Sequence, residues 1–345
     1  MLGSVARAFS DDIAVDLGTA NTLVHVVGRG IVIDEPSVVA VRNEKGSRDI
    51  VAVGLRAKAM HGRTPEPVEL LRPMRDGVIA DFVATEAMLS AFLRRTRRML
   101  GFRSPRILVC VPSGATPLER RAVHETATTL GARKVYLVEE RVAAALGAGL
   151  PIDRGQAYMV VDIGGGTSDI AVVREGRVYA SRSLRLAGNA MDEAIVRYVR
   201  REHQLLIGEA SAERIKIEAG SALPRAGGSG IEIRIRGRDL RDAHMKTAVL
   251  GRSDIAAALA NPVRELAEFV QRAFEDLPGD IAREIANVGI VLTGGGALLE
   301  DLDAAIARQV GVRVGVPATP MHCVIRGTAN VLEDLDRHGH LLLSP

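Results

Sequence analysis

The sequence contains no tryptophan, only 3% aromatic residues in all and only two cysteines. Cys110 and Cys323 are too few for a disulfide framework or a structural zinc cluster, and their apolar neighbours predict reduced thiols buried in the core. Scarce aromatic side chains leave little on which nucleic-acid bases can stack, and a net charge of +3 is a weak electrostatic footprint. We therefore expect no nucleic-acid partner.

Long hydrophobic runs are also absent. No apolar stretch reaches the roughly 18 residues that suggest a membrane-spanning helix, and the N-terminus lacks the apolar region and cleavage site of a secretory signal. With 47% hydrophobic and 25% charged residues, the composition is that of a globular protein, and 345 residues suggest two domains. These features predict a cytoplasmic location.

Several familiar nucleotide and metal motifs are missing. The sequence has no GxxxxGK(S/T) loop, no GxGxxG turn after its first strand and no HExxH pattern. These absences exclude a P-loop protein and argue against a Rossmann domain and a zinc protease. A phosphate site in this chain must therefore come from other glycine-rich turns.

What the chain does contain is an internal repeat. Residues 13–27 read IAVDLGTANTLVHVV, and residues 159–173 read MVVDIGGGTSDIAVV. Each segment is an apolar strand, an aspartate, a glycine-rich turn and a second apolar strand. Two unrelated hairpins are the alternative, but the shared Asp-(Leu/Ile)-Gly favours two similar halves, each opening with a phosphate-type hairpin.

These two hairpins have the chemistry that a nucleotide phosphate requires. Glycine lets backbone N–H groups approach an anion closely, and the two turns are Gly18, Thr19, Ala20 and Asn21, and Gly164, Gly165, Gly166 and Thr167. Asp16 and Asp162 end the preceding strands and suit a Mg²⁺ bound through water. Each aspartate alone is explained as a turn residue capping its own loop, but their pairing by the repeat favours the metal.

The other segments predict an α/β fold. Strands at 106–112 and 134–140 alternate with helices at 117–131 and 141–149, and 288–311 reads as strand, glycine turn and helix. This alternation predicts a largely parallel sheet with helices on both faces. Residues 32–75 read as a small β-rich insertion in the first half. Residues 185–250, with helical segments and the strand IEIRIRGRDL, read as an insertion in the second.

Two further features bear on a nucleotide site. The turn Gly294, Gly295 and Gly296 admits a flat ligand close to the backbone, although alone it favours a tight strand-to-helix turn. Hydrolysis needs a group that orients water towards the γ-phosphate. Glu139 and Glu140 end a strand and are equally placed to do so, the alternative being an acidic residue that stabilises the next helix N-terminus.

The combined motifs resemble the actin, heat-shock chaperone and sugar-kinase ATPase superfamily, and within it the MreB family of bacterial actins. The strings that carry the resemblance run from about residue 12 to 335 and include DLGTANTLV, GIVIDEPSVVAV, RPMRDGVIADF, CVPSGAT, VVDIGGGTSDIAVV, IGEASAERIK and VLTGGGALL. The resemblance implies an actin-like fold of two duplicated halves with ATP and Mg²⁺ in the cleft between them. The first-half core is expected at 1–31, 76–154 and 320–345 with its insertion at 32–75; the second-half core is expected at 155–184 and 251–319 with its insertion at 185–250.

The resemblance also assigns residues. It implies phosphate contacts for the two glycine turns, ribose and base contacts for Glu213 and Lys216, and an adenine-side turn at Gly294, Gly295, Gly296 and Ala297. It selects Glu140 rather than Glu139 as the water-positioning acid, with Thr167 as its catalytic partner. The sequence departs from the family at Arg141, where proline is usual, and at Asn189, where aspartate is usual. We expect a slow ATPase whose hydrolysis acts as a timer.

An arginine-rich segment, residues 92–106, reads FLRRTRRMLGFRSPR. Its apolar tip, Met99, Leu100 and Phe102, resembles the family's membrane-insertion loop, with arginines placed to pair with anionic lipid. Leu2, Val5 and Phe9, at helical spacing, form a second possible anchor. The alternative is a helix end with a solvated basic face and a buried tip.

The resemblance predicts a filament of self-associating subunits, peripheral on the inner face of the cell membrane, that organises cell-wall synthesis and rod shape. It implies MreC, MreD, RodZ and wall synthases as partners. One alternative is a non-polymerising, ATP-binding adaptor of a membrane machine such as that of pili, but EPSVVA and RPMRDGVIADF favour the filament. A small-molecule kinase lacks a segment for an acceptor site, and a folding chaperone lacks a substrate domain.

Overall fold

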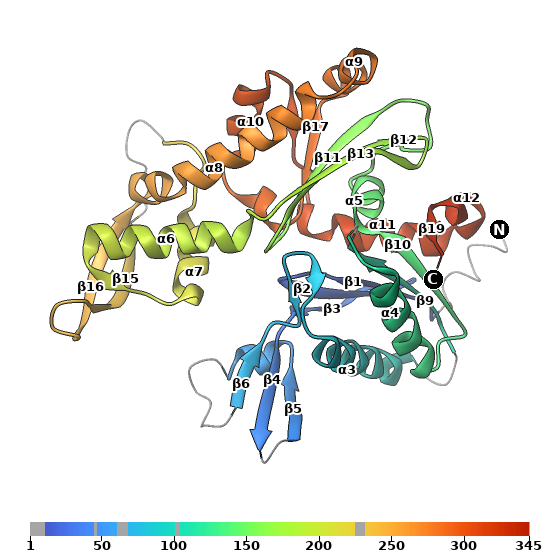
Figure 1. Cartoon of the computed structure of the whole chain (residues 1–345), viewed down its shortest axis with the longest axis horizontal. Helices are drawn as coiled ribbons and strands as arrows, with labels where there is room; N and C mark the ends of the chain where they lie inside the picture. The colour runs from blue at the N-terminus through green and yellow to red at the C-terminus, as the bar shows by residue number, and fades with distance from the viewer. Residues whose placement is uncertain are drawn as a thin grey trace. The chain divides into compact units, whose positions relative to one another are not determined.

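The computed structural model describes residues 11–44, 47–60, 68–100, 104–112, 114–224 and 232–344 (Figure 1). The chain divides into two compact units. Unit 1 comprises residues 1–156, 173–179 and 322–345, and unit 2 comprises residues 157–172 and 180–321. Each unit is built on its own β-sheet.

The sheet of unit 1 has six strands in the order β19-β10-β9-β1-β2-β3. The strands are β1 (Ile13–Leu17), β2 (Asn21–Val26), β3 (Gly30–Pro36), β9 (Arg106–Val111), β10 (Lys134–Glu139) and β19 (Leu342–Leu343). The central strands β1, β9 and β10 are parallel, as predicted. The expectation of a largely parallel sheet was wrong for β2, β3 and β19, which pair antiparallel. Short turns join β1, β2 and β3, and such turns cannot form a parallel crossover.

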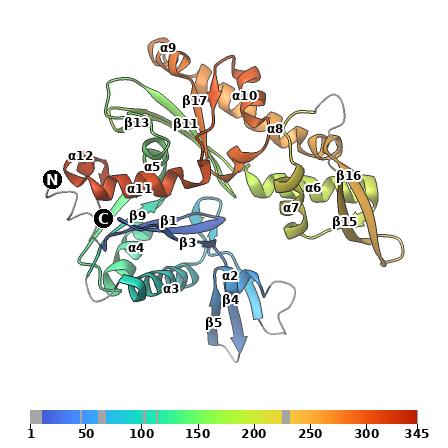
Figure 2. The ribbon, with the colours of Figure 1, turned by 180° about the vertical axis from the view of Figure 1, so that it is seen from behind.

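Helices cover both faces of this sheet, as the alternation of elements predicted. In Figures 1 and 2, α5 and α11 lie on one side of β1 and β9, and α3 and α4 lie on the other. The helices are α3 (Phe82–Leu100), α4 (Pro117–Thr129), α5 (Glu140–Gly147), α11 (Cys323–Glu333) and α12 (Leu335–His338), followed by the 3₁₀ turn Gly339–Leu341. Helix α4 begins with a capping box between Thr116 and Glu119, which stabilises its first turn.

A smaller sheet continues unit 1 after β3, in the region predicted to be β-rich. It has the order β5-β4-β6 and consists of β4 (Val39–Glu44), β5 (Ser47–Val53) and β6 (Val68–Leu71), with α2 (Leu55–Lys58) after β5. A two-stranded hairpin, β7 (Met74–Arg75) and β8 (Val78–Ile79), then leads into α3.

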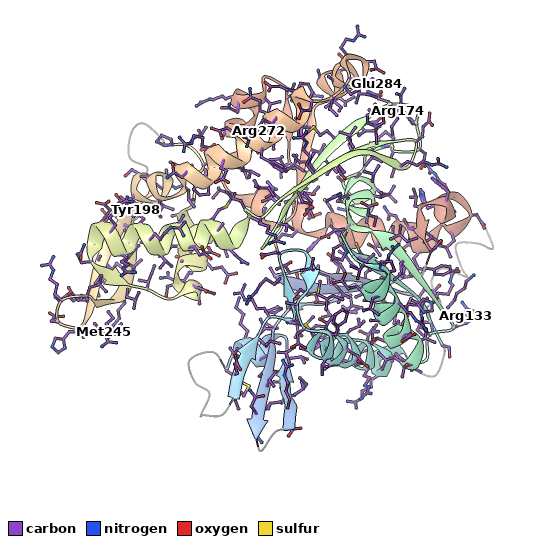
Figure 3. All side chains as sticks on the ribbon, viewed as in Figure 1. Arg133, Arg174, Tyr198, Met245, Arg272 and Glu284 are labelled. Carbon is purple, nitrogen blue, oxygen red and sulfur yellow. The ribbon has the colours of Figure 1, made fainter. Side chains whose placement is uncertain are left out.

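The sheet of unit 2 has five strands in the order β13-β12-β11-β17-β18. They are β11 (Tyr158–Ile163), β12 (Ser168–Arg174), β13 (Arg177–Leu184), β17 (Ile290–Thr293) and β18 (Val314–Gly315), and β11, β17 and β18 are parallel. Helices α8 (Arg252–Glu275), α9 (Gly279–Val288) and α10 (Leu302–Val310) pack with this sheet around one hydrophobic core. Glu284 on α9, labelled in Figure 3, accepts a 2.6 Å hydrogen bond from Ala157 N just before β11.

The rest of unit 2 confirms the helical and strand content predicted for residues 185–250. It holds α6 (Gly188–His203), β14 (Leu205–Leu206), α7 (Glu209–Ala219), β15 (Glu232–Asp239) and β16 (Met245–Gly251). Along β15 exposed and buried residues alternate strictly, as a strand with one solvent face requires. Tyr198 of α6 donates a 3.0 Å hydrogen bond to Asp254 of α8, and Figure 3 labels Tyr198 on its helix.

Two further predictions concern cysteines and membrane helices. Cys110 and Cys323 are buried thiols that form no disulfide, which confirms their predicted state. Among the residues with a described structure, no helix combines the length and apolar character needed to cross a bilayer.

Candidate functional site

The first glycine turn, between β1 and β2, is tight and heavily bonded. A Cβ on Gly18 would lie 2.6 Å from the carbonyl oxygen of Asn21, so only glycine fits there without a shift. Thr19 Oγ1 accepts a hydrogen bond from Gly77 N at 3.3 Å, which ties the turn to the β7–β8 hairpin. Asn21 Nδ2 donates to Asp34 Oδ1 on β3 at 2.9 Å. The first glycine turn is therefore held by hydrogen bonds to two other elements, the β7–β8 hairpin and β3.

The strand register brings the first glycine turn and the acidic candidate Glu140 of unit 1 to the same edge of the sheet. Asp16 lies opposite Cys110, and Cys110 lies opposite Val138. Gly18 and Glu140 therefore both follow the carboxyl ends of parallel strands, two strands apart, or roughly 10 Å at the usual strand spacing. Ligands commonly bind at this edge of an α/β sheet.

Glu139 and Glu140, the two candidates for the water-positioning acid, belong to different elements of the structure. Glu139 ends β10 and precedes the helix, whereas Glu140 is the first residue of α5 and is half-buried. Arg141 Nη1 lies 3.9 Å from Glu139 Oε1. The residue that departs from the family pattern thus forms an ion pair with Glu139.

The second glycine turn, between β11 and β12, is closed by Gly164 N donating to Thr167 O at 2.9 Å. The first turn of α6 is bonded directly to it. Gly188 N donates to Gly164 O at 3.1 Å, and Asn189 N donates to Gly165 O at 2.8 Å. Asn189, at the position where the family usually has aspartate, therefore helps to hold the second glycine turn through its backbone N–H.

Lys216 on α7 holds the first turn of α6, which is itself bonded to the second glycine turn. Its Nζ donates to Gly188 O at 2.9 Å and lies 2.9 Å from Asp192 Oδ1. Lys216 is mostly buried, and Glu213, one helical turn earlier, is half-buried. Unit 2 therefore brings together the glycine turn, the start of α6 and the α7 residues assigned to ribose and base.

Asp162, at the end of β11, is enclosed by the protein. Thr293 Oγ1, on the adjacent parallel strand β17, donates to Asp162 Oδ1 at 2.9 Å. The pKa of Asp162 is raised to about 6, chiefly because burial penalises the charged form; the nearby Asp169 also raises it, whereas the Thr293 hydrogen bond lowers it. An ionised carboxylate in this setting favours a neighbouring cation.

The third glycine run, residues 294–297, lies beside the second turn because β11 and β17 are parallel neighbours. Gly294 has φ +80°, and a Cβ there would overlap Ile163 O; a Cβ on Gly296 would overlap the Ile163 side chain. Gly295–Leu298 form a 3₁₀ turn in which Ala297 is buried. Close packing against Ile163 of β11 thus explains why Gly294 and Gly296 are glycines. This agrees with the alternative stated above, that these residues form a tight strand-to-helix turn.

The buried aspartates suit a divalent cation that is bound together with phosphate. No cluster of three or more histidine, cysteine, aspartate or glutamate side chains within the described ranges is arranged to hold a metal ion. Asp16 in unit 1 and Asp162 in unit 2 are buried carboxylates. Mg²⁺ typically keeps several waters and takes one or two carboxylates plus phosphate oxygens, and a buried carboxylate next to a glycine turn, present in each unit by itself, fits that preference.

The arginine-rich end of α3 is only partly a free basic surface. Arg95 pairs with Glu35, Arg97 donates to Leu130 O, and Arg106 Nη2 lies 2.6 Å from Asp12 Oδ2. Met99 is 56% exposed in the last turn of α3. Phe102, the side chain of Leu100, and the terminal residues Leu2, Val5 and Phe9 lie outside what the structure describes.

Two supporting residues were missed by the sequence analysis. Thr293 is the direct partner of Asp162, and Ser37, just after β3, bonds to the first glycine turn. Nothing in the local sequence marks either one, because each acquires its role from a strand that is distant in the chain. The string EPSVVA contained Ser37 but indicated no role for it.

Comparisons with known proteins place these features in a family. A family model described as MreB/Mbl protein matches residues 10–340. The cell shape-determining protein MreB of Escherichia coli (strain K12) is 48% identical over 347 residues, covering 100% of this chain and 99% of that protein. The cell shape-determining protein Mbl of Bacillus subtilis (strain 168) is 43% identical, covering 95% of this chain and 98% of that protein.

Solved structures agree. The crystal structure of MreB5 of Spiroplasma citri bound to ADP has a TM-score of 0.86 at 34% identity, and the match covers 95% of this chain and 98% of the MreB5 chain. The structure of the same protein bound to AMPPNP has a TM-score of 0.87 at 34% identity, and the match covers 95% of this chain and 97% of that chain. A MamK double helical filament shares the fold, with a TM-score of 0.76 at 21% identity and coverages of 93% and 99%. The resemblance and the actin-like fold predicted from the sequence are confirmed.

Proposed function

Because the chain belongs to the MreB/Mbl family, we propose that it is an ATP-binding bacterial actin that assembles into filaments and determines cell shape. The relatives named above are cell shape-determining proteins, which supports the role. The observation that carries the proposal is the pair of glycine turns at the carboxyl edges of two similar sheets, each placed just after a buried aspartate.

The nucleotide is assigned to both units. Crystals of MreB5 contain ADP or AMPPNP, which supports nucleotide binding here. The phosphates are assigned to residues 18–21 and 164–167, the ribose and base to Glu213 and Lys216, and the adenine side to residues 294–297. The four-part division predicted from the sequence, with insertions at 32–75 and 185–250, belongs to the same proposal.

Mg²⁺, when bound with the nucleotide, neutralises phosphate charge, and Asp16 and Asp162 would hold it through water. Glu140 orients a water molecule for attack on the γ-phosphate, with Thr167 as its partner. We expect slow hydrolysis, as suits a filament whose hydrolysis acts as a timer. A turnover number above roughly 10 s⁻¹, the median for enzymes, would contradict that role.

The filament is proposed to lie on the inner face of the cell membrane, attached through the segment at Met99, Leu100 and Phe102. The exposed Met99 side chain supports this placement. MreC, MreD, RodZ and the wall synthases are the partners that family membership suggests, and self-association builds an open, head-to-tail polymer.

Electron microscopy of the purified protein with Mg-ATP on an anionic lipid monolayer tests this function. We expect membrane-bound filaments with ATP and none when nucleotide is removed. Binding of ATP without filaments in any nucleotide state would instead favour the non-polymerising adaptor. Failure to bind ATP, measured on the same sample by equilibrium dialysis, would refute both.

A further inference from the structure

Ser37 lies immediately after β3 and is completely enclosed, with 0% of its surface exposed. Its position brings it against the first glycine turn. Ser37 Oγ donates to the carbonyl oxygen of Gly18 at 2.6 Å, and Ser37 N donates to the carbonyl oxygen of Ala20 at 2.8 Å. One residue therefore binds two carbonyl groups of the turn.

A second hydroxyl fixes the direction of this network. Thr22 Oγ1 and Ser37 Oγ are 2.9 Å apart, and both side chains are buried. A serine hydroxyl has one proton, and a carbonyl oxygen can only accept. Since the Ser37 proton is used on Gly18 O, the Thr22 hydroxyl must donate to Ser37 Oγ. Hydrogen bonds in such a chain polarise and strengthen one another.

The two anchored carbonyls determine where the turn's N–H groups point. In a planar trans peptide the C=O of one residue and the N–H of the next point in opposite directions. Drawing the carbonyls of Gly18 and Ala20 towards Ser37 therefore directs the N–H groups of Thr19 and Asn21 away from it. Successive N–H groups presented in this way by a tight turn form an anion-binding concavity.

We propose that Ser37 is a positioning residue for nucleotide phosphate: it holds the first glycine turn so that the N–H groups of Thr19 and Asn21 face the phosphate. The inference rests on the proposed ATP-binding function and adds a residue that contacts no nucleotide atom itself. Without Ser37 Oγ the Gly18–Thr19 peptide is free to rotate, and a rotated peptide presents a carbonyl oxygen to the anion. That repulsion weakens binding beyond the loss of one donor.

The test compares Ser37→Ala with a matched control, Thr22→Val, in the full chain. Both remove one buried hydroxyl from the same network, and we expect Ser37→Ala to lower the melting temperature of the nucleotide-free protein more, because it leaves more buried groups without a hydrogen bond. Only Ser37→Ala releases Gly18 O. Titration with a fluorescent ATP analogue should therefore show about tenfold weaker binding for Ser37→Ala and less than a twofold change for Thr22→Val.

Equal affinities for Ser37→Ala and the wild type, or equal losses in the two variants, would overturn the inference. If Ser37→Ala does not fold, hydrogen exchange of the wild type decides, because Mg-ATP should slow exchange at Thr19 and Asn21. No protection there while ATP is bound would also overturn it. A wild type that binds no ATP analogue would refute the proposed function itself, a distinct result from selective failure of the Ser37 variant.

Discussion

The buried Asp162 carboxylate accepts a hydrogen bond from the Thr293 hydroxyl. Its pKa is raised to about 6 chiefly because burial penalises the charged form. A group whose pKa is higher in the folded state stabilises the fold at low pH, and that contribution is lost as pH rises through the folded value. For Asp162 the loss falls between about pH 4, the unfolded value, and about pH 6.

Replacing Asp162 with asparagine should therefore stabilise the nucleotide-free protein above pH 6 by up to about 3 kcal/mol, since a raised pKa of this size corresponds to that energy. Below about pH 4 the difference should vanish. Urea unfolding of both proteins at several pH values measures it. The same variant should bind Mg-ATP more weakly, because the proposed metal ligand is gone. A stability difference that does not change with pH would contradict the charge argument.

Glu139 and Glu140 are adjacent in sequence but differ in structure, since Arg141 lies near the Glu139 carboxylate. Glu140→Gln should slow ATP hydrolysis by roughly 100-fold, a typical contribution of a positioned acid or base, while ATP affinity changes less than twofold. Phosphate release at saturating Mg-ATP measures the rate. Glu139→Gln is the matched control and should stay near the wild-type rate. A larger loss in the control would assign the water-positioning role to Glu139.

At the scale of elements, the packing of α5 on α11 depends on two glycines. A Cβ on Gly147 would overlap Cys323 O, and a Cβ on Gly327 would overlap Ala143 O. These are backbone contacts, so no side-chain rotation can relieve them. Since Glu140 begins α5, the close crossing of the two helices also determines where that glutamate lies.

Gly327→Ala should therefore destabilise the protein by about 3 kcal/mol or more, although alanine normally stabilises a helix more than glycine does. Thermal unfolding followed by circular dichroism measures the change. Gly339→Ala is a suitable control, because a Cβ there would meet nothing within 4 Å. A melting temperature for Gly327→Ala equal to that of the control would show that the helices can separate at little cost.

At the scale of the whole molecule, only some of the arginines of α3 are bonded to other parts of unit 1. Arg95 and Arg97 are bonded to Glu35 and Leu130 O, although Arg95 is itself exposed, and Arg94 and Arg98 form a further exposed pair. The exposed pair, next to the exposed Met99, leaves a basic and apolar helix end that suits an anionic bilayer. Part of the arginine-rich segment is thus bonded to the protein, and the rest is available as a basic surface.

Changing Met99, Leu100 and Phe102 together to serine should reduce co-sedimentation with anionic vesicles at least tenfold, because each apolar side chain contributes roughly 1.5 kcal/mol or more when buried. ATP binding should be unaffected. Leu118→Ser provides a control for exposed apolar surface, since Leu118 is 68% exposed on α4. Unchanged co-sedimentation of the triple variant would move the membrane anchor to another part of the chain.

The sequence alone was sufficient for the features that depend on neighbouring residues. The repeated strand, aspartate and glycine turn at residues 13–27 and 159–173 predicted both hairpins, and the alternation along 231–240 predicted β15. Such patterns are local, because strand period and glycine placement act over a few residues. Motif strings along most of the chain were specific enough to indicate the family.

Only the tertiary structure decided which distant groups meet. Thr293 bonds to Asp162 across 131 residues of chain, and Ser37 reaches Gly18 because β2 and β3 pair with Asn21 opposite Pro36. A shift of one residue in either pairing would turn these side chains to the opposite face. Sequence therefore determined the turns that are proposed to bind phosphate, whereas strand pairing determined the groups that hold them, because hydrogen-bond partners depend on which strands become neighbours.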